Sequence, residues 1–209
     1  MKRHLSCQWF VLLCVGNKMN LTDIAKILFF TSIIIWILPP FKQYKGRYFY
    51  FFAIFAIIDP INLIFPFIFK LNSPPQITIF LLYAALLSLI DFKYLKANWI
   101  WVLIFTIVLF FPTIFKFDST KIVLTYVFLE AAITLIVLKN LITLFVAKEK
   151  LSLFHTIFLI YQLTIIVKFS NLLIGFADAL AFFILTSIAQ IFFGLYFSIF
   201  REDKPGVSV

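Results

Sequence analysis

The sequence predicts an all-α fold, a polytopic transmembrane helix bundle with about seven spans. Three observations lead to this fold class. Of the 209 residues, 64% are apolar and only 13% are charged, whereas soluble domains carry about 45–50% apolar and about 25% charged residues. Apolar segments of roughly 17 to 25 residues follow one another, each long enough to cross a hydrocarbon core about 30 Å thick. Lysine and arginine gather in the short connections between these segments, as they do in membrane proteins.

The N-terminal 18 residues differ from the rest of the chain. A basic start at Lys2 and Arg3 precedes a short apolar run, which is typical of a secretory signal segment. Met19 offers an equal alternative, in which translation starts there and the preceding residues are a misannotated extension; a short extra embedded helix is a third interpretation. The chain then divides into residues 1–18, a single transmembrane helical domain at 19–200 and a cytoplasmic tail at 201–209.

The spans follow in order along this domain. We expect them at residues 21–38, 48–69, 76–90, 98–115, 120–146, 151–167 and 175–200. Pro39 and Pro40 end the first span, and Pro60 is expected to kink the second because it removes a helix hydrogen bond. The fifth span should leave the hydrocarbon near Lys139 and continue as a cytoplasmic helix. A polar break that starts at Lys168 separates the sixth span from the seventh.

The basic residues are shared unevenly between the two sides of this bundle. One side collects ten: Lys42, Lys45, Arg47, Lys93, Lys96, Lys139, Lys148, Lys150, Arg201 and Lys204. The other collects six: Lys18, Lys26, Lys70, Lys116, Lys121 and Lys168. Because cytoplasmic connections carry the excess of Lys and Arg, we predict a bacterial inner-membrane protein with its N-terminus outside and its C-terminus in the cytoplasm.

The net charge of +9 does not indicate nucleic-acid binding, because these cations sit in short connections where they meet anionic lipid headgroups. Aromatic residues accompany them on the basic side: Tyr44, Tyr48, Tyr50, Tyr94, Trp99 and Trp101. We interpret these as an interfacial aromatic belt. The lipid bilayer is therefore the expected partner of the outer surface.

Glu130 is the first candidate for a functional group. An ionisable side chain inside the hydrocarbon costs on the order of 2.5–3.5 kcal/mol, so it should face the bundle interior or a cavity. Tyr126 and Thr134 lie one helical turn before and after it, which places all three on one face. Glu130 could carry a proton, pair with a ligand or act as a base; the alternative is an uncharged acid that is hydrogen-bonded to neighbouring helices.

Asp59 is the second candidate, in the middle of the second span. Pro60 follows it and frees a backbone carbonyl, and Asn62 lies three residues further on. These side chains could line a small polar pocket, or they could only satisfy the backbone groups that Pro60 opens.

His155 and Gln162, seven residues apart on one face of the sixth span, complete the candidates for ligand binding or proton transfer. A metal held by His155 and Glu130 is conceivable, but no metal-binding spacing is present, and a hydrogen-bonded structural histidine is favoured. We expect no metal site. In the seventh span, Gln190 and Gly194 are the residue types that bring membrane helices into close packing.

Motifs of enzymes and cofactor proteins are missing from the sequence. It contains no Gly-rich phosphate loop, no His-Glu-x-x-His, no Cys-x-x-Cys and no Gly-x-Ser-x-Gly. Retinal proteins have a lysine in the middle of the last span, and residues 175–200 contain none. No catalytic residue is assigned, and the cofactor stays unknown.

Three functions remain open. The topology resembles the seven-span input domains of bacterial signalling proteins, which implies a non-enzymatic sensory or receptor-like module for a small or lipidic ligand. The tail at 201–209 is too short for an output domain, so signalling would need a separate output protein. The second hypothesis is an accessory or scaffold subunit that binds other membrane subunits. The third is a small intramembrane enzyme or transporter, which requires Asp59, Glu130 and His155 to converge on one site.

Overall fold

The computed structural model describes residues 21–69, 75–114 and 119–202, and every regular element in these ranges is an α-helix. The predictions for residues 1–18 and for most of the tail lie outside the described residues. The helices are α2 (Leu21–Trp36), α3 (Leu38–Lys42), α4 (Phe49–Phe69), α5 (Pro75–Ser88), α6 (Phe92–Ala97), α7 (Trp99–Ile114), α8 (Ser119–Lys148), α9 (Leu153–Ile174) and α10 (Ala179–Ile199).

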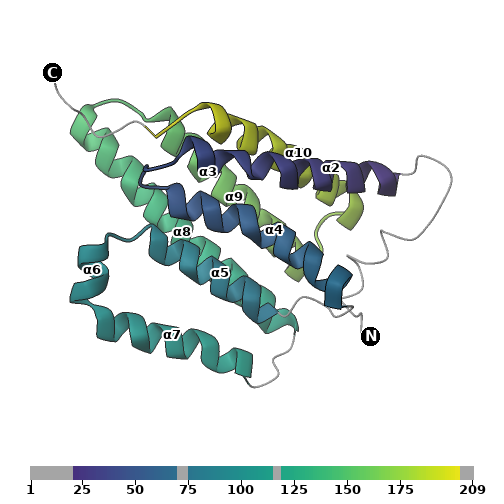
Figure 1. Ribbon diagram of the computed structural model, residues 1–209, viewed down its shortest axis with the longest axis horizontal. Helices are drawn as coiled ribbons and strands as arrows, with labels where there is room; N and C mark the ends of the chain where they lie inside the picture. The colour runs from purple at the N-terminus through teal and green to yellow at the C-terminus, as the bar shows by residue number, and fades with distance from the viewer. Residues whose placement is uncertain (1–20, 70–74, 115–118, 203–209) are drawn as a thin grey trace.

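The long helices lie roughly side by side, and the chain turns at two ends of the bundle (Figure 1). Residues 43–48, the segment with α6, residues 149–152 and the end of α10 gather at one end. The connection between α9 and α10 lies at the other end. We call these the Gln43 end and the Gly175 end. The arrangement is that of a helix bundle in which successive helices run in opposite directions.

Within the described residues, four helical segments are long and apolar enough to cross a membrane: Leu21–Lys42, Thr120–Ala147, Leu153–Ile174 and Ala179–Ile199. The helices α5 and α7 have 14 and 16 residues, or about 21 and 24 Å at 1.5 Å per residue, which falls short of a core of about 30 Å. The chain is therefore a membrane protein with four clear candidate spans, and the count of about seven stays a prediction.

The helix is interrupted at Ile37, between α2 and α3, next to the end predicted at Pro39 and Pro40. These prolines lie in the first turn of α3, where a missing backbone N–H is tolerated, and the apolar segment continues to Lys42. The break predicted at Lys168 is wrong, because α9 continues through it to Ile174. The helix ends at Gly175, whose φ of 66° is the left-handed conformation that glycine adopts readily. Helix α10 begins only at Ala179.

Helices α8 and α9 pack along regular apolar stripes. On α8, Leu129, Ile133 and Val137 recur every four residues and are fully buried. On α9, Phe158 and Ile165, seven residues apart, are also buried. Such spacing places each set on one helical face. These stripes meet the side chains of α4 and α5 in one continuous core.

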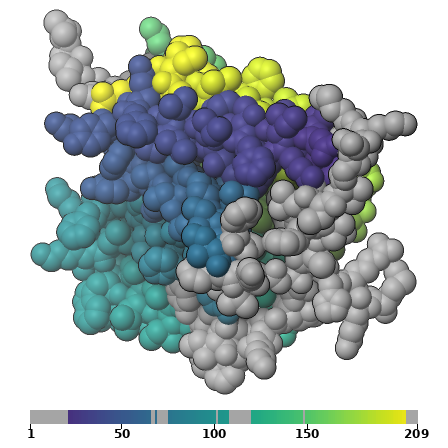
Figure 2. Space-filling model, turned by 45° about the vertical axis from the view of Figure 1, so that its right-hand side comes forward, coloured from purple at the N-terminus to yellow at the C-terminus, as the bar shows by residue number. Residues whose placement is uncertain are grey.

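Helix α10 lies against α2 in both views of the molecule (Figures 1 and 2). Gly194 allows this close approach, because a Cβ atom there would lie 2.8 Å from Ile35 Cγ2 and 3.2 Å from Trp36 Nε1. The Trp36 indole donates to the backbone carbonyl of Gln190 at 3.0 Å. Small residues and interhelical hydrogen bonds are the usual means of joining membrane helices.

The outer surface is strongly apolar. Ile34, Leu135 and Phe192 expose 65%, 65% and 69% of their surface. A soluble protein rarely exposes such residues on every helix, whereas lipid covers them in a membrane protein. The helix bundle therefore fits a bilayer environment.

Candidate polar cavity inside the helix bundle

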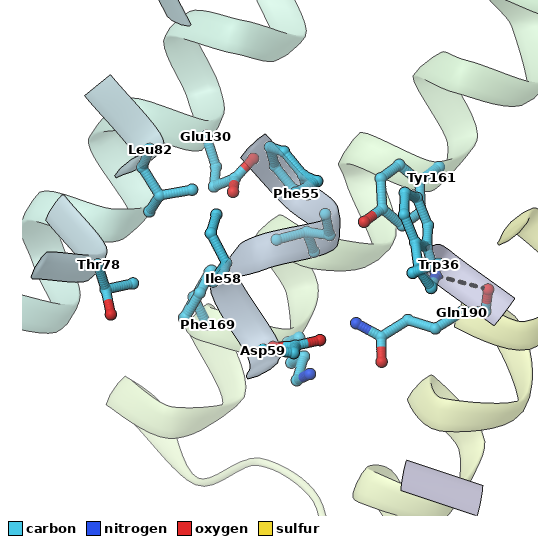
Figure 3. Close-up of a pocket in the computed structure, with 12 residues that line it drawn as sticks. Trp36, Phe55, Ile58, Asp59, Thr78, Leu82, Glu130, Tyr161, Phe169 and Gln190 are labelled. Carbon is cyan, nitrogen blue, oxygen red and sulfur yellow. Dashed lines mark hydrogen bonds between the residues drawn. The ribbon is translucent and has the colours of Figure 1, made fainter. Parts of the chain in front are cut away.

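A cavity of about 70 Å³ lies inside the bundle (Figure 3). A cavity needs at least about 10–15 Å³ to hold one water molecule, so this volume has room for a small number of them. Helices α2, α4, α5, α8, α9 and α10 contribute its lining: Trp36, Phe55, Ile58, Asp59, Thr78, Leu82, Glu130, Tyr161, Ile165, Lys168, Phe169 and Gln190. Three of these residues carry ionisable groups of the kind that the hydrocarbon core disfavours.

Asp59 lies at the centre of α4, ten residues from Phe49 and ten from Phe69. Its side chain shares the cavity with Lys168 of α9, and the charges of the two groups act on each other. Lys168 lies six residues before Ile174, or about 9 Å along the axis from the end of its helix. An acidic and a basic side chain from two helices that are far apart in the sequence thus line one cavity.

Glu130 lies on α8 and is only 1% exposed. Neither carboxyl oxygen has a hydrogen-bond partner among the described residues. Figure 3 shows the carboxyl group directed between Leu82 and Phe55. A buried polar group is normally hydrogen-bonded. The nearby Thr134 hydroxyl does not donate to the Glu130 carboxyl group, because it donates to the backbone carbonyl of Glu130 at 2.7 Å. The Glu130 carboxyl is therefore available to a ligand or a proton.

The opposite wall of the cavity is aromatic and amide-bearing. The rings of Trp36 and Tyr161 stack with their centroids 4.7 Å apart. Figure 3 shows the Tyr161 hydroxyl and the Gln190 amide turned toward the cavity. The cavity lining therefore contains a hydroxyl group and an amide group as well as the carboxyl groups of Asp59 and Glu130.

Asn62, a predicted site residue, lies one turn beyond Asp59 and accepts a hydrogen bond from the Thr78 hydroxyl at 3.1 Å. Tyr126 donates to the Pro75 carbonyl at 3.4 Å. Neither Asn62 nor Tyr126 lines the cavity, whereas Thr78 does. Gln162 is fully buried outside the cavity, and its amide atoms have no partner among the described residues.

His155 lies away from the cavity, near the Gln43 end. Its Nε2 atom is 3.0 Å from the Tyr48 hydroxyl and its Nδ1 atom is 2.9 Å from the Ser152 hydroxyl. Asn140 donates to the Tyr48 hydroxyl at 3.1 Å and accepts from Arg47 at 3.4 Å. These five side chains are the Tyr48 network. Asp59 and Glu130 share one cavity, but His155 is not brought to them.

Tyr48 was expected in an interfacial belt, yet its side chain is fully buried, while Tyr44 and Tyr50 expose 58% and 67%. Burial raises the pKa of Tyr48, in the connection before α4, to about 12. The phenol therefore keeps its proton at neutral pH and can donate to His155 Nε2, while it accepts from Asn140. This arrangement fits a neutral His155 with its proton on Nδ1.

At the Gln43 end of the bundle, Gln43 itself is hydrogen-bonded to the C-terminus of α10. Its amide nitrogen donates to the carbonyls of Phe197 and Phe200 at 3.2 and 2.8 Å. Its amide oxygen accepts from the backbone N–H of Glu202 at 3.4 Å. The buried amide satisfies carbonyls that the end of a helix leaves open.

Lys168, Tyr161 and Gln190 were not predicted as site residues. A signal for Lys168 was present in the sequence, because Tyr161, Ile165 and Lys168 have the spacing of one helical face. The mistaken break in α9 hid it, since a lysine placed in a connection needs no partner. Gln190 was interpreted as a packing residue, and its backbone carbonyl does hold Trp36.

Comparison of the chain with protein families, with curated proteins and with solved structures gives no match. Among the described residues, no group of three or more His, Cys, Asp or Glu side chains is placed to hold a metal ion. The function must therefore be argued from the cavity.

Proposed function

We propose that this chain is a membrane-embedded binding module of sensory or receptor-like type, which holds one small polar ligand in the cavity. The observation that carries the proposal is the buried Glu130 carboxyl, which lines a cavity without any hydrogen-bond partner in the described part of the chain. Natural proteins leave few buried polar groups unsatisfied, and those that remain need an explanation. A bound ligand supplies it.

The size of the cavity narrows the ligand class. Pockets for drug-sized ligands measure about 300–1,000 Å³, whereas this cavity measures about 70 Å³. A lipidic ligand is therefore disfavoured, and an ion or a small polar solute is favoured. Our proposal places the protein in the inner membrane with the Gln43 end in the cytoplasm, where a separate output protein would receive the signal.

Ligand binding can be tested with the full chain in lipid nanodiscs. Thermal unfolding is measured with a panel of small solutes and salts, since a ligand that binds only the folded state raises the unfolding temperature. We expect at least one member to stabilise the wild type and the Glu149→Gln control, whose side chain is exposed at the end of α8. Glu130→Gln should lose this stabilisation. Equal stabilisation of both variants would contradict the proposal.

A carrier is the second candidate, favoured by the opposite charges of Asp59 and Lys168 on α4 and α9. Ionisable groups inside a membrane mark ion and substrate pathways, and a transported ion could separate these two charges. Proteoliposomes loaded with buffer and placed in a gradient of the stabilising solute decide between the two candidates. Flux that Asp59→Asn abolishes favours a carrier, whereas binding without flux favours a receptor.

A further inference from the structure

We infer that the ligand of the cavity is a single monovalent cation that replaces a proton on Glu130. This inference rests on the proposed binding function and names its ligand. With both carboxyl groups ionised, Asp59 and Glu130 contribute two negative charges and Lys168 one positive charge. The sum is one net negative charge. A single monovalent cation, or a single proton, balances it.

The distribution of these charges identifies Glu130 as the exchanging group. Asp59 already interacts with Lys168, whereas the Glu130 oxygens have no partner in the described residues. An ionised carboxylate without a partner is costly in a dry interior. Glu130 is therefore neutral while it holds a proton and becomes ionised when a cation takes the proton's place.

The surrounding groups suit a cation. Hard cations take oxygen ligands, and the lining offers the Glu130 carboxyl and the Tyr161 hydroxyl, with the Gln190 amide beside them. The titratable groups that face Glu130 are Asp59 from α4 and Tyr161 and Lys168 from α9. Helices α2, α5 and α10 present only uncharged side chains to the cavity.

The exchange step balances in atoms and charge. The Glu130 carboxylic acid loses its proton to water, and the resulting carboxylate binds the entering cation. No covalent bond besides the O–H bond is broken, and no electron is transferred. The net charge of the cavity is the same with a proton or with a monovalent cation on Glu130, so one proton leaves for each cation that enters. This stoichiometry is the measurable signature of the site.

Proton release is measured with the full chain in nanodiscs, in weakly buffered solution with a pH-sensitive dye. Sodium, potassium or ammonium chloride is added over roughly pH 5 to 9, the interval in which buried carboxyl groups titrate. N-methylglucamine chloride supplies the same anion with a cation too large for the cavity. We expect one proton per chain with at least one small cation, none with N-methylglucamine, and full release in the Glu149→Gln control.

Two variants at the site make the result decisive. Glu130→Gln should release no proton, because an amide carries none to exchange. If this variant does not fold, Glu130→Asp keeps a carboxyl group on a shorter side chain and should release one proton at a higher cation concentration.

The outcomes separate this inference from the proposed function. Absence of cation-dependent release from the wild type, or equal release from Glu130→Gln, overturns the cation inference. The binding function survives that result if a neutral or anionic solute raises the unfolding temperature in a Glu130-dependent manner. If no solute raises the unfolding temperature in this way, the proposed binding function is also overturned.

Discussion

The polar cavity and the Tyr48 network are both buried polar clusters of this bundle, yet they differ in how their hydrogen bonds are satisfied. In the network, both ring nitrogens of His155 and both ends of the Asn140 amide have partners within 3.4 Å. In the cavity, the Glu130 oxygens have none among the described residues. A satisfied network rigidifies a fold, whereas an unsatisfied group leaves room for a ligand. The comparison separates a structural cluster from a candidate functional one.

The largest effect on stability is expected from His155→Ala. This change removes a ring that is buried between Tyr48 and Phe154, and the hydroxyl groups of Tyr48 and Ser152 each lose their hydrogen bond to it. We expect the free energy of unfolding to fall by about 3 kcal/mol, measured by chemical unfolding in mixed micelles. Thr156→Ala is the control, because the Thr156 hydroxyl donates only to the backbone carbonyl of Ser152, the N-cap residue of α9. Equal stability of the two variants would show that the network does not hold the fold.

Tyr48→Phe tests the same network with a smaller change. It keeps the ring and removes one hydroxyl, which leaves His155 Nε2 and the Asn140 amide nitrogen without this partner. A loss of about 1–2 kcal/mol is expected. Tyr50→Phe removes an equivalent hydroxyl from a residue that is 67% exposed and should change stability by less than about 0.5 kcal/mol. A similar loss in both variants would refute a special role for the buried hydroxyl.

The four candidate spans of the described residues could be predicted from the sequence, because long apolar runs have few alternatives in lipid. The prediction that ionisable groups face the interior follows from the same physics, and Glu130 and Asp59 do line one cavity. Their shared cavity could not be deduced, since the spacing of residues along one helix does not show which other helix it faces.

The errors have a common origin in how basic and aromatic residues are interpreted. Lys168 was assigned to a connection and Tyr48 to the membrane interface, because such residues are most often found there. In the structure, Lys168 lines the cavity within α9 and Tyr48 is fully buried. Both positions depend on partners that lie on other helices. A single sequence contains no signal for such partners.

Gln162→Met extends the comparison to a second unsatisfied group. The Gln162 amide is buried without a partner among the described residues, so an apolar side chain of similar volume should stabilise the fold by up to about 1 kcal/mol. Gln43→Met is the matched control, because the Gln43 amide makes three interhelical or backbone hydrogen bonds and its loss should destabilise. Destabilisation by both variants would indicate that Gln162 has a partner in the membrane.

Glu130→Gln should have the smallest effect on stability when no salt is added. The carboxyl group has no hydrogen bond to lose in the described structure, and the amide has nearly the same shape, so the free energy of unfolding should change by less than about 0.5 kcal/mol. Addition of a cation that occupies the site should then stabilise the wild type and leave the variant unchanged. A loss of about 2 kcal/mol without salt, which matches the network variants, would make Glu130 a structural group. The cavity and the Tyr48 network would then not differ in kind, and the argument for a ligand in the cavity would be refuted.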